Sequence, residues 1–374
     1  MSAQGRSRLM HAFFDTRKHP WLVWLGFALI GIALALLPFA LAQIGTSWVR
    51  ITNYAILYIL LALGLNIVVG FAGLLDLGYI AFYAVGAYTY ALLASPHFNL
   101  HLPFWVILPI GAAVAAFFGL LLGAPTLKLR GDYLAIVTLG FGEIIRIFLN
   151  NLSRPVNITN GPQGIARIDP FRLDGFSFGS YETFLGIELS GPIKYYYLLL
   201  AVVLGVIVVN VRLQNSRVGR AWEAIREDEI AARSMGINTR NMKLLAFAMG
   251  ASFGGVAGGM FSAIQAFISP ESFVLVESIM VVSMVVLGGM GNVWGVILGA
   301  LLLSFVPEIL RWTVEPAQHA LFGRMVVEPE VIRMLLFGLA LVLIMLFRPA
   351  GLLPSAVRRR ELAERSEAPQ GHPL

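Results

Sequence analysis

The chain has 374 residues, of which 58% are apolar and only 13% are charged. A soluble domain carries about 25% charged residues, so this composition excludes a water-soluble fold and indicates a protein of the lipid bilayer. The net charge of +6 fits loops beside anionic lipid and does not indicate nucleic-acid binding, while the absence of cysteine excludes disulfides and cysteine metal sites.

The apolar runs along the chain predict membrane spans. At about 20 residues for each crossing, the length allows around ten spans. The run Trp21–Ala42 is predicted as an uncleaved first span, because it is longer than the h-region of a signal peptide, although Ala40-Leu41-Ala42 resembles a signal-peptidase site. Further apolar segments cover residues 53–71, 74–93, 103–124, 133–150, 193–211, 244–267, 278–287, 293–307 and 331–347. Several of these are short or broken by glycine, and we expect re-entrant segments among them.

These segments predict an all-α polytopic membrane protein with about ten transmembrane or re-entrant helices and a cytosolic helix. Residues 1–20 would form a basic tail, 21–347 the transmembrane domain and 348–374 a charged tail. Eighteen of the 27 lysines and arginines then fall on the side of both termini, which predicts that this side is cytosolic. The loop at about 151–192 would be periplasmic, and it is long enough to form either a docking site or a structural cap.

A polar segment at about 212–243 interrupts the apolar pattern. It holds six arginines, one lysine and four acidic residues, and its alanines favour a helix of about four turns that ends at Gly236. An apolar stripe is predicted along this helix, formed by Trp222, Ile225, Ile230 and Met235. A solvated loop helix does not need such a stripe, so we interpret the segment as a docking helix for a soluble partner, with a solvated loop as the alternative.

Small and polar residues within the apolar segments give further predictions. Gly250, Gly254 and Gly258 recur every four residues and predict a groove for close helix packing, with sliding of the two packed helices as a functional addition. Glu143 and Arg146 are spaced to neutralise each other in a span. A second group either lines a translocation path or makes helix–helix hydrogen bonds: Asn66, Gly70, Gly73, Tyr79, Tyr83 and Asn292.

The sequence shows no pattern for an enzyme. The glycine cluster at 288–295 is not followed by the Lys-Ser/Thr of a phosphate-binding loop, and no Gly-x-Ser-x-Gly occurs. The six histidines lack metal-ligand spacing. We therefore predict no catalytic residue, metal site or cofactor in this chain.

Several longer motifs together resemble one family of transport proteins. They are LGLNIVVGFAGLLDLGYIAFYAVGAYTYALL (63–93), RGDYLAIVTLGFGEIIRIFLNN (130–151), TNGPQGI (159–165), GRAWEAIREDEIAARSMGIN (219–238), VVLGGMGNVWGVILGA (285–300) and LFRPAGLL (346–353). The chain thus resembles the permeases of branched-chain amino acid ABC importers, and most of all their larger, LivM-type subunit.

The resemblance implies a coupling helix that seats in a partner ATPase. The family's Glu-Ala-Ala motif with a following glycine is matched by Ala231, Ala232 and Gly236, while Ile230 occupies the glutamate position and Glu229 comes one place earlier. The alanines would allow close approach, and Gly236 would turn the chain back to the membrane. Polar contacts to the ATPase are implied for Arg220, Glu223, Arg226, Glu227, Asp228, Glu229 and Arg233.

The resemblance also implies partners and a location. These are a second homologous permease, two cytosolic ATPase subunits that use ATP and magnesium, and a periplasmic binding protein, all at a bacterial inner membrane. The implied cargo is a branched-chain or related amino acid. The same architecture serving urea or an amide remains open, and so does an autonomous secondary transporter, although an ion-coupled carrier needs no docking helix.

Overall fold

The computed structural model describes residues 20–126, 129, 131–173, 176–184, 187–322, 331–332, 335, 338–339, 342, 346–347 and 351–354. Internal contacts divide the chain into a first unit at Met1–Arg50 and a second at Ile51–Leu374. The first unit contains α2 (Pro20–Ile44) and the start of α3 (Thr46–Asn66). All functional features described below belong to the second unit.

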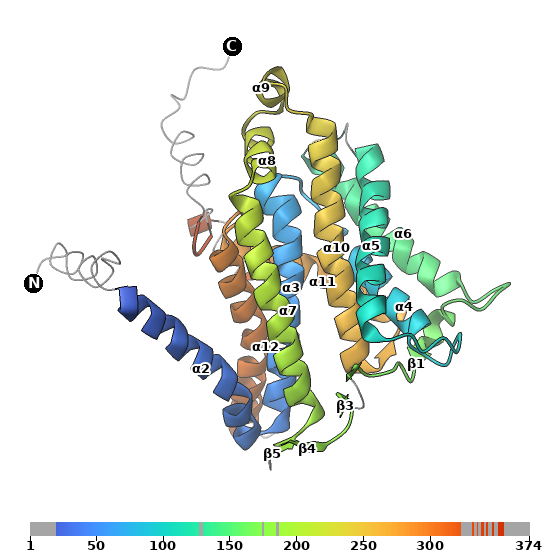
Figure 1. Cartoon of the computed structure of the whole chain (residues 1–374), viewed down its shortest axis with the longest axis vertical. Coiled ribbons are helices and arrows are strands. Elements are labelled where there is room, and N and C mark those ends of the chain that lie inside the picture. Colours follow the sequence, from blue (N-terminus) through green and yellow to red (C-terminus); the bar gives the residue numbers. More distant parts are fainter. Residues whose placement is uncertain are drawn as a thin grey trace, which may run out of the picture. The chain divides into compact units, whose positions relative to one another are not determined.

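The second unit is helical over most of its described length (Figure 1), so the predicted all-α class is confirmed. After α3, its helices are η1 (Ile67–Phe71, a π-helix), α4 (Ile80–Leu93), α5 (Phe104–Thr126), α6 (Asp132–Asn151), η2 (Gly161–Gln163), α7 (Gly191–Gln214), α8 (Arg217–Glu227), α9 (Glu229–Ser234), α10 (Thr239–Gln265), η3 (Pro270–Ser272), α11 (Leu275–Gly288) and α12 (Val293–Phe322).

Five helical segments among the described residues are long and apolar enough to cross a membrane: Thr46–Phe71, Phe104–Thr126, Gly191–Gln214, Thr239–Gln265 and Pro270–Gly288. The last of these joins η3 to α11 across the non-helical residues Phe273 and Val274, so α11 itself is shorter. The total of ten crossings stays a prediction, because the segment at 331–347 lies mostly outside the described residues.

Two predicted segments end or begin at different residues. The segment predicted to start at residue 74 becomes helical only at Ile80, because Gly73 has a φ of +69° and the Asp76 carboxylate accepts the Gly78 N–H at 2.9 Å in a local turn. The last described helix was predicted to end at Pro307, but α12 continues through it to Phe322. A proline inside a helix removes one backbone hydrogen bond, and here it does not end the helix.

The glycines of α10 form the predicted packing groove. A Cβ atom on Gly250 would lie 2.5 Å from the Val68 side chain of η1, and one on Gly258 would lie 2.6 Å from the Ala87 nitrogen of α4. On the other face, a Cβ atom on Gly255 would lie 2.6 Å from a backbone oxygen of α5. Side chains at these positions would push the helices apart, so α10 holds η1, α4 and α5 at backbone contact distance.

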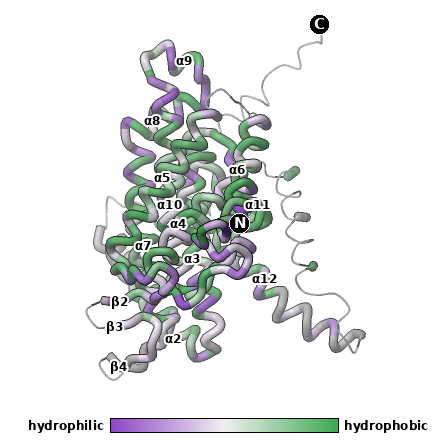
Figure 2. Tube along the Cα trace, turned by 90° about the vertical axis from the view of Figure 1, so that its right-hand side faces the viewer, coloured by the Kyte–Doolittle hydropathy of each residue, from purple (hydrophilic) through white to green (hydrophobic). Residues whose placement is uncertain are grey.

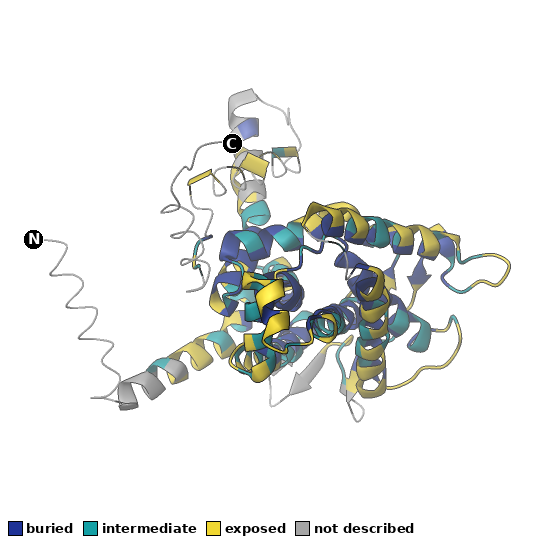
Figure 3. Cartoon of the chain, turned by 90° about the horizontal axis from the view of Figure 1, so that it is seen from above, coloured by how far each residue is buried: buried dark blue, intermediate teal, exposed yellow. Residues whose placement is uncertain are grey.

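The outer faces of the helices are apolar and exposed. Large side chains such as Phe117 on α5 (61% exposed) and Tyr133 and Ile136 on α6 (73% and 65%) project outward. Viewed from above in Figure 3, buried residues lie on the inward-facing sides of the helices and exposed residues on the outer sides. Figure 2 shows the hydrophobic residues along the helices and hydrophilic residues at α8 and α9. A lipid environment explains this pattern, because a soluble protein rarely exposes apolar patches of this extent.

At the end of the second unit opposite α8 and α9 (Figure 1), the loop at 151–192 forms small antiparallel hairpins, and one more of its strands pairs with the residues that follow α10. The strands are β1 (Ile165–Ala166) paired with β6 (Phe267–Ile268), β2 (Arg172–Leu173) paired with β3 (Phe176–Ser177), and β4 (Glu182–Phe184) paired with β5 (Ile187–Leu189). The Lys194 ammonium donates to the carbonyls of Ser177 and Ser180 at 2.9 and 3.0 Å, which ties the hairpins to α7.

The glycine groove gives a stability prediction. Gly258→Val is expected to lower the melting temperature of the purified chain or to prevent folding, because overpacking a close contact costs about 1–3 kcal/mol. Gly205→Val in α7 is the matched control, since a Cβ atom there has no neighbour within 4 Å. Melting would be followed by size-exclusion chromatography after heating in detergent. Equal melting temperatures of the two variants would contradict the packing role of Gly258.

Candidate functional site

The polar segment forms two helices rather than the predicted single helix of about four turns. Asp228 has extended backbone angles (φ −152°, ψ 111°) between α8 and α9, and its carboxylate accepts the N–H groups of Ile230 and Ala231. An aspartate that caps a new helix competes with continuation of the old one, which explains the break. Ser216 caps α8 in the same way through the N–H groups of Val218 and Gly219.

The predicted apolar stripe divides at this break. On α8, Trp222 is fully buried and its indole N–H donates to the Met242 carbonyl of α10 at 2.7 Å, while Ile225 is 6% exposed. On α9 and just after it, Ile230 is 68% exposed and Met235 is 86% exposed. The chain's own core therefore covers the α8 part of the stripe, and only the α9 part is open.

The end of α9 has the geometry predicted for Gly236. Its φ is +85°, and the N–H groups of Gly236 and Ile237 return to the carbonyls of Arg233 and Ala232. A non-glycine residue is strained at this angle. Of the two motif alanines, Ala231 is exposed and Ala232 is buried in the chain itself. Only Ala231 is open to close approach by a partner.

Ionic contacts fix α9 to the start of α10. The Lys243 ammonium lies 2.9 Å from the Glu229 carboxylate, and Arg233 reaches the same carboxylate at 3.4 Å. A cavity of about 490 Å³ adjoins them, lined by Ala124, Pro125, Glu229, Arg233, Thr239, Arg240 and Lys243. Glu229 thus serves an internal ion pair, whereas Arg220 and Glu227 are exposed and Glu223 is half-buried on α8. Their predicted contacts with a partner stay predictions.

Arg226 points toward the transmembrane helices instead of outward. Its guanidinium donates to the Gly70 carbonyl of η1 at 2.5 Å, and a Cβ atom on Gly73 would lie 2.7 Å from the Arg226 side chain. Gly73 therefore provides both the positive φ and the space that this contact needs. Arg226 connects α8 to η1, a link that the sequence pattern did not indicate.

Four of the six predicted path residues gather near this link. The Asn66 side-chain oxygen accepts the Gly291 N–H at 2.9 Å, and a Cβ atom on Gly70 would lie 2.6 Å from the same nitrogen. Gly73 lies against Arg226. Asn292 follows Gly291, and its side chain donates to the Leu353 carbonyl at 2.9 Å. Asn66, at the end of α3, thus bonds to the turn between α11 and α12, and Asn292 in that turn bonds to the segment at 351–354, so neither bond joins two helices.

The other two predicted path residues are Tyr79, just before α4, and Tyr83, in its first turn. Tyr79 is fully buried, and its hydroxyl donates to the Gly250 carbonyl at 2.9 Å, which joins the start of α4 to α10. The Tyr83 ring contacts Phe261 and Phe273 at centroid distances of 5.3 and 5.4 Å. Lining of a path by these six residues stays a prediction.

The predicted pair of Glu143 and Arg146 is present at 2.5 Å, and Arg146 also lies 3.2 Å from the Glu271 carboxylate of η3. Sequence reasoning missed Glu271 and a second polar contact, in which the Tyr58 hydroxyl donates to Glu277 at 2.8 Å. Glu277 lies just before the segment predicted at 278–287, and its position at the edge of an apolar run was the available signal. Within the described part of the chain, no group of acidic and histidine side chains is arranged for a metal.

Comparison with known proteins agrees with this architecture. Residues 47–345 match the family model described as the permease component of the branched-chain amino acid transport system. The chain belongs to this permease family. No solved structure matches it significantly.

Individual members of the permease family show how broad the similarity is. Over 354 residues the chain is 46% identical to the high-affinity branched-chain amino acid transport permease protein LivM of Escherichia coli K12, covering 90% of this chain and 77% of that protein. A probable LivM of Methanocaldococcus jannaschii is 29% identical over 66% of this chain and 68% of its own length. The permease protein LivH of Escherichia coli K12 is 24% identical over 67% of this chain and 81% of its own length.

The contact of Arg226 with Gly70 predicts a measurable change in η1. In Arg226→Ala, the backbone amides of residues 67–74 should exchange with deuterium about tenfold faster or more, because a hydrogen bond from a charged group contributes about 1.5–3 kcal/mol. Arg220→Ala is the control, since the exposed Arg220 donates to the Asn215 carbonyl, five residues earlier in the chain, and not to η1. Unchanged exchange in Arg226→Ala would show that the contact does not hold η1.

Proposed function

We propose that this chain is the transmembrane permease subunit of an ATP-binding cassette importer that carries branched-chain amino acids across a bacterial inner membrane. The observation that carries the proposal is α9, a capped and glycine-terminated helix with exposed apolar side chains at one end of an apolar helical bundle. Membership of the permease family over residues 47–345 supports it, and so does the function named for the relatives.

In this proposal α9 and the outer face of α8 dock into a cytosolic ATPase subunit. Ile230 and Met235 are the apolar anchors, and burying such a side chain contributes about 1.5–3 kcal/mol. Arg220, Glu223, Glu227 and Arg233 form the polar surroundings. The ATPase binds ATP and magnesium, and the permease chain contributes no residue to that chemistry.

Movement of the ATPase would reach the membrane helices through contacts of α8. Trp222 fixes α8 to α10, and Arg226 fixes it to η1. A displacement of α9 and α8 would therefore move α10 and η1 as well, as in a rigid-body conformational change.

The complete importer in this proposal contains a second, homologous permease, two ATPases and a periplasmic binding protein. Similarity to LivH as well as to LivM supports the second permease, because two related chains can form a pseudo-symmetric pair. The hairpins at the opposite end from α9 are the proposed docking surface for the binding protein. Both chain termini are proposed to be cytosolic, on the side of α8 and α9.

The orientation can be tested by cysteine labelling, because the chain has no cysteine of its own. In intact cells, the variant Ser234→Cys, changed at the last residue of α9, should resist an impermeant thiol reagent. Ser180→Cys, in the exposed hairpin region at the other end, should be labelled readily. Labelling of both after the membrane is permeabilised is the control for reactivity. Labelling of Ser234→Cys in intact cells would reverse the topology and contradict the proposed function.

If the ATPases dock through α9, replacing its exposed apolar side chains should release the ATPases and leave the permease in the membrane. The double variant Ile230→Glu, Met235→Glu should keep its abundance in the membrane, since both side chains are exposed, but should retain at least tenfold less ATPase in a pull-down and lose leucine uptake. Asn215→Glu, an exposed change between α7 and α8, is the control for added charge. Normal ATPase retention in the double variant would reduce α9 to a solvated helix.

A further inference from the structure

Two helices of the second unit are too short to cross the bilayer alone. α4 and α11 have 14 residues each, or about 21 Å at 1.5 Å per residue, compared with about 30 Å of hydrocarbon. The first turns of α11 contact the segment that precedes α4, because the Ser278 hydroxyl of α11 donates to the Leu77 carbonyl at 2.5 Å. The two short helices therefore begin close together.

A carboxylate lies beside these helix starts, in the first turn of α11 and far along the apolar segments from their ends at α8. Glu277 is eleven residues before the end of α11, about 17 Å along the helix, and Tyr58 is thirteen residues before the end of η1, about 20 Å along. The hydrogen bond of 2.8 Å between them joins α11 to α3. A charged side chain at such a depth is costly unless it has a function or a counter-charge.

No counter-charge for Glu277 is found within the part of the chain that the structure describes. The carboxylates that form ion pairs there are those of Asp169, Glu143, Glu271 and Glu229. Glu277 is half-buried and not sealed in the core. Its carboxylate therefore has capacity for a cation that comes from outside the chain.

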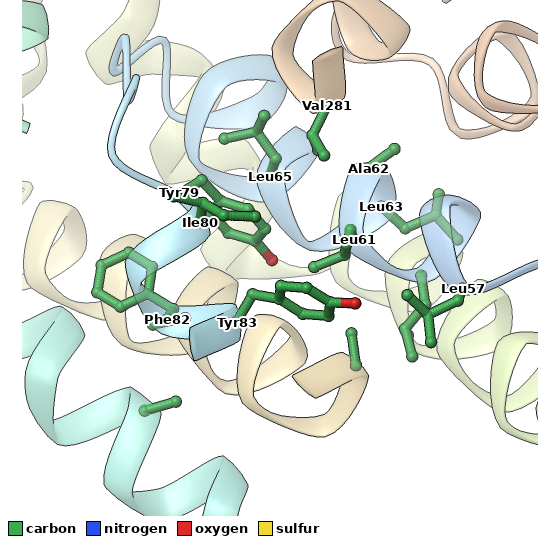
Figure 4. Close-up of a cluster of buried hydrophobic side chains, with 14 of the residues drawn as sticks. Leu57, Leu61, Ala62, Leu63, Leu65, Tyr79, Ile80, Phe82, Tyr83 and Val281 are labelled. Carbon is green, nitrogen blue, oxygen red and sulfur yellow. The ribbon is translucent and has the colours of Figure 1, made fainter. Parts of the chain in front are cut away.

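Aromatic rings cluster around Tyr83, on the helix α4 that packs against α11. The Tyr83 ring lies 5.3 Å from Phe261 and 5.4 Å from Phe273, and Tyr54 lies 6.5 Å from Phe261. Figure 4 shows the Tyr83 hydroxyl directed toward Leu57 and Leu61 of α3, the helix that also carries Tyr58. One turn toward the hairpin end, the Tyr54 hydroxyl donates to Gln265 at 2.6 Å.

This combination suits an organic ammonium group. A carboxylate neutralises the positive charge, a tyrosine hydroxyl and an amide oxygen accept its N–H bonds, and aromatic faces attract it within about 6 Å of their centres. An inorganic divalent cation would require several oxygen ligands with full charges, and only one carboxylate is present in the cluster.

We propose that Glu277, together with Tyr58 and Tyr83, binds the α-ammonium group of the amino acid during its passage through the permease. The inference rests on the proposed function and names the part of the substrate that this cluster recognises. Gln265 and Tyr54 lie at the entrance to the site, toward the hairpin end of the unit. The alternative occupant, a basic side chain of the second permease, is an outcome of the test below.

The test uses the complete importer, with both permeases, the ATPases and the binding protein, in proteoliposomes. Glu277→Gln keeps the shape of the side chain and removes its charge, and it should lower the maximal rate of leucine uptake at least tenfold. Glu271→Gln, an exposed change six residues earlier, should stay within twofold of the wild type. Tyr58→Phe, which keeps the ring, should give an intermediate rate.

A direct readout is photolabelling with a diazirine analogue of leucine during ATP turnover. In the wild type, peptides of α3, α10 and α11 around Tyr58, Phe261 and Glu277 should be labelled, and this labelling should fall at least fivefold in Glu277→Gln. Binding of leucine to the separate binding protein must stay unchanged. A purely structural role of Glu277 would lower the melting temperature and would leave labelling per folded complex unaltered.

The outcomes separate the two proposals. Absence of leucine uptake by the wild-type complex would overturn the proposed function and this inference with it. Wild-type uptake and labelling in Glu277→Gln would overturn the inference alone. Loss of the second permease from purified Glu277→Gln complexes would also overturn it, by identifying the carboxylate as a contact between subunits.

Discussion

The transmembrane unit depends on the close contact of α10 with three neighbours. Apolar side chains gain little by leaving lipid for protein, so helix association in a bilayer relies on van der Waals contact at short range. Gly250, Gly255 and Gly258 allow that contact with η1, α5 and α4, respectively. Because the short link Met235–Asn238 joins α9 to α10, the helix at the centre of the packing is also the one that continues into the proposed docking region.

The docking region is consequently part of the bundle and not a separate loop. Trp222 bonds to α10, while Arg226 crosses to η1, where a π-helix has replaced the regular α-helical turn. Single-turn π-helices occur often at functional sites, since they leave backbone groups available for other contacts. Here the Gly70 carbonyl accepts a hydrogen bond from the Arg226 guanidinium. The short helix α8 is therefore bonded both to α10 and to η1.

The sequence was sufficient for features that depend on neighbouring residues. Apolar runs located most helices within a few residues, the i,i+3 spacing identified the pair of Glu143 and Arg146, and Gly236 marked a turn. It was insufficient where two local interactions compete for the same backbone groups, or where a contact depends on a residue far away in the sequence. The capping of α9 by Asp228 outweighed the helix propensity of the alanines around it. Tyr58 and Glu277 are 219 positions apart, so no local pattern indicates that they meet.

The polar groups near the starts of α4 and α11 serve two different purposes. Ending a helix inside the apolar layer exposes backbone groups that lipid cannot satisfy, so side chains must bond to them. Thr138 accepts the Leu77 N–H, Asp76 accepts that of Gly78, and Ser278 donates to the Leu77 carbonyl. Glu277 differs from these residues, because among the described residues its carboxylate accepts only the Tyr58 hydroxyl and no backbone N–H. The need to satisfy the backbone therefore explains Asp76 but not Glu277, whose carboxylate bonds to a tyrosine hydroxyl of another helix and is the group that we assign to the ligand.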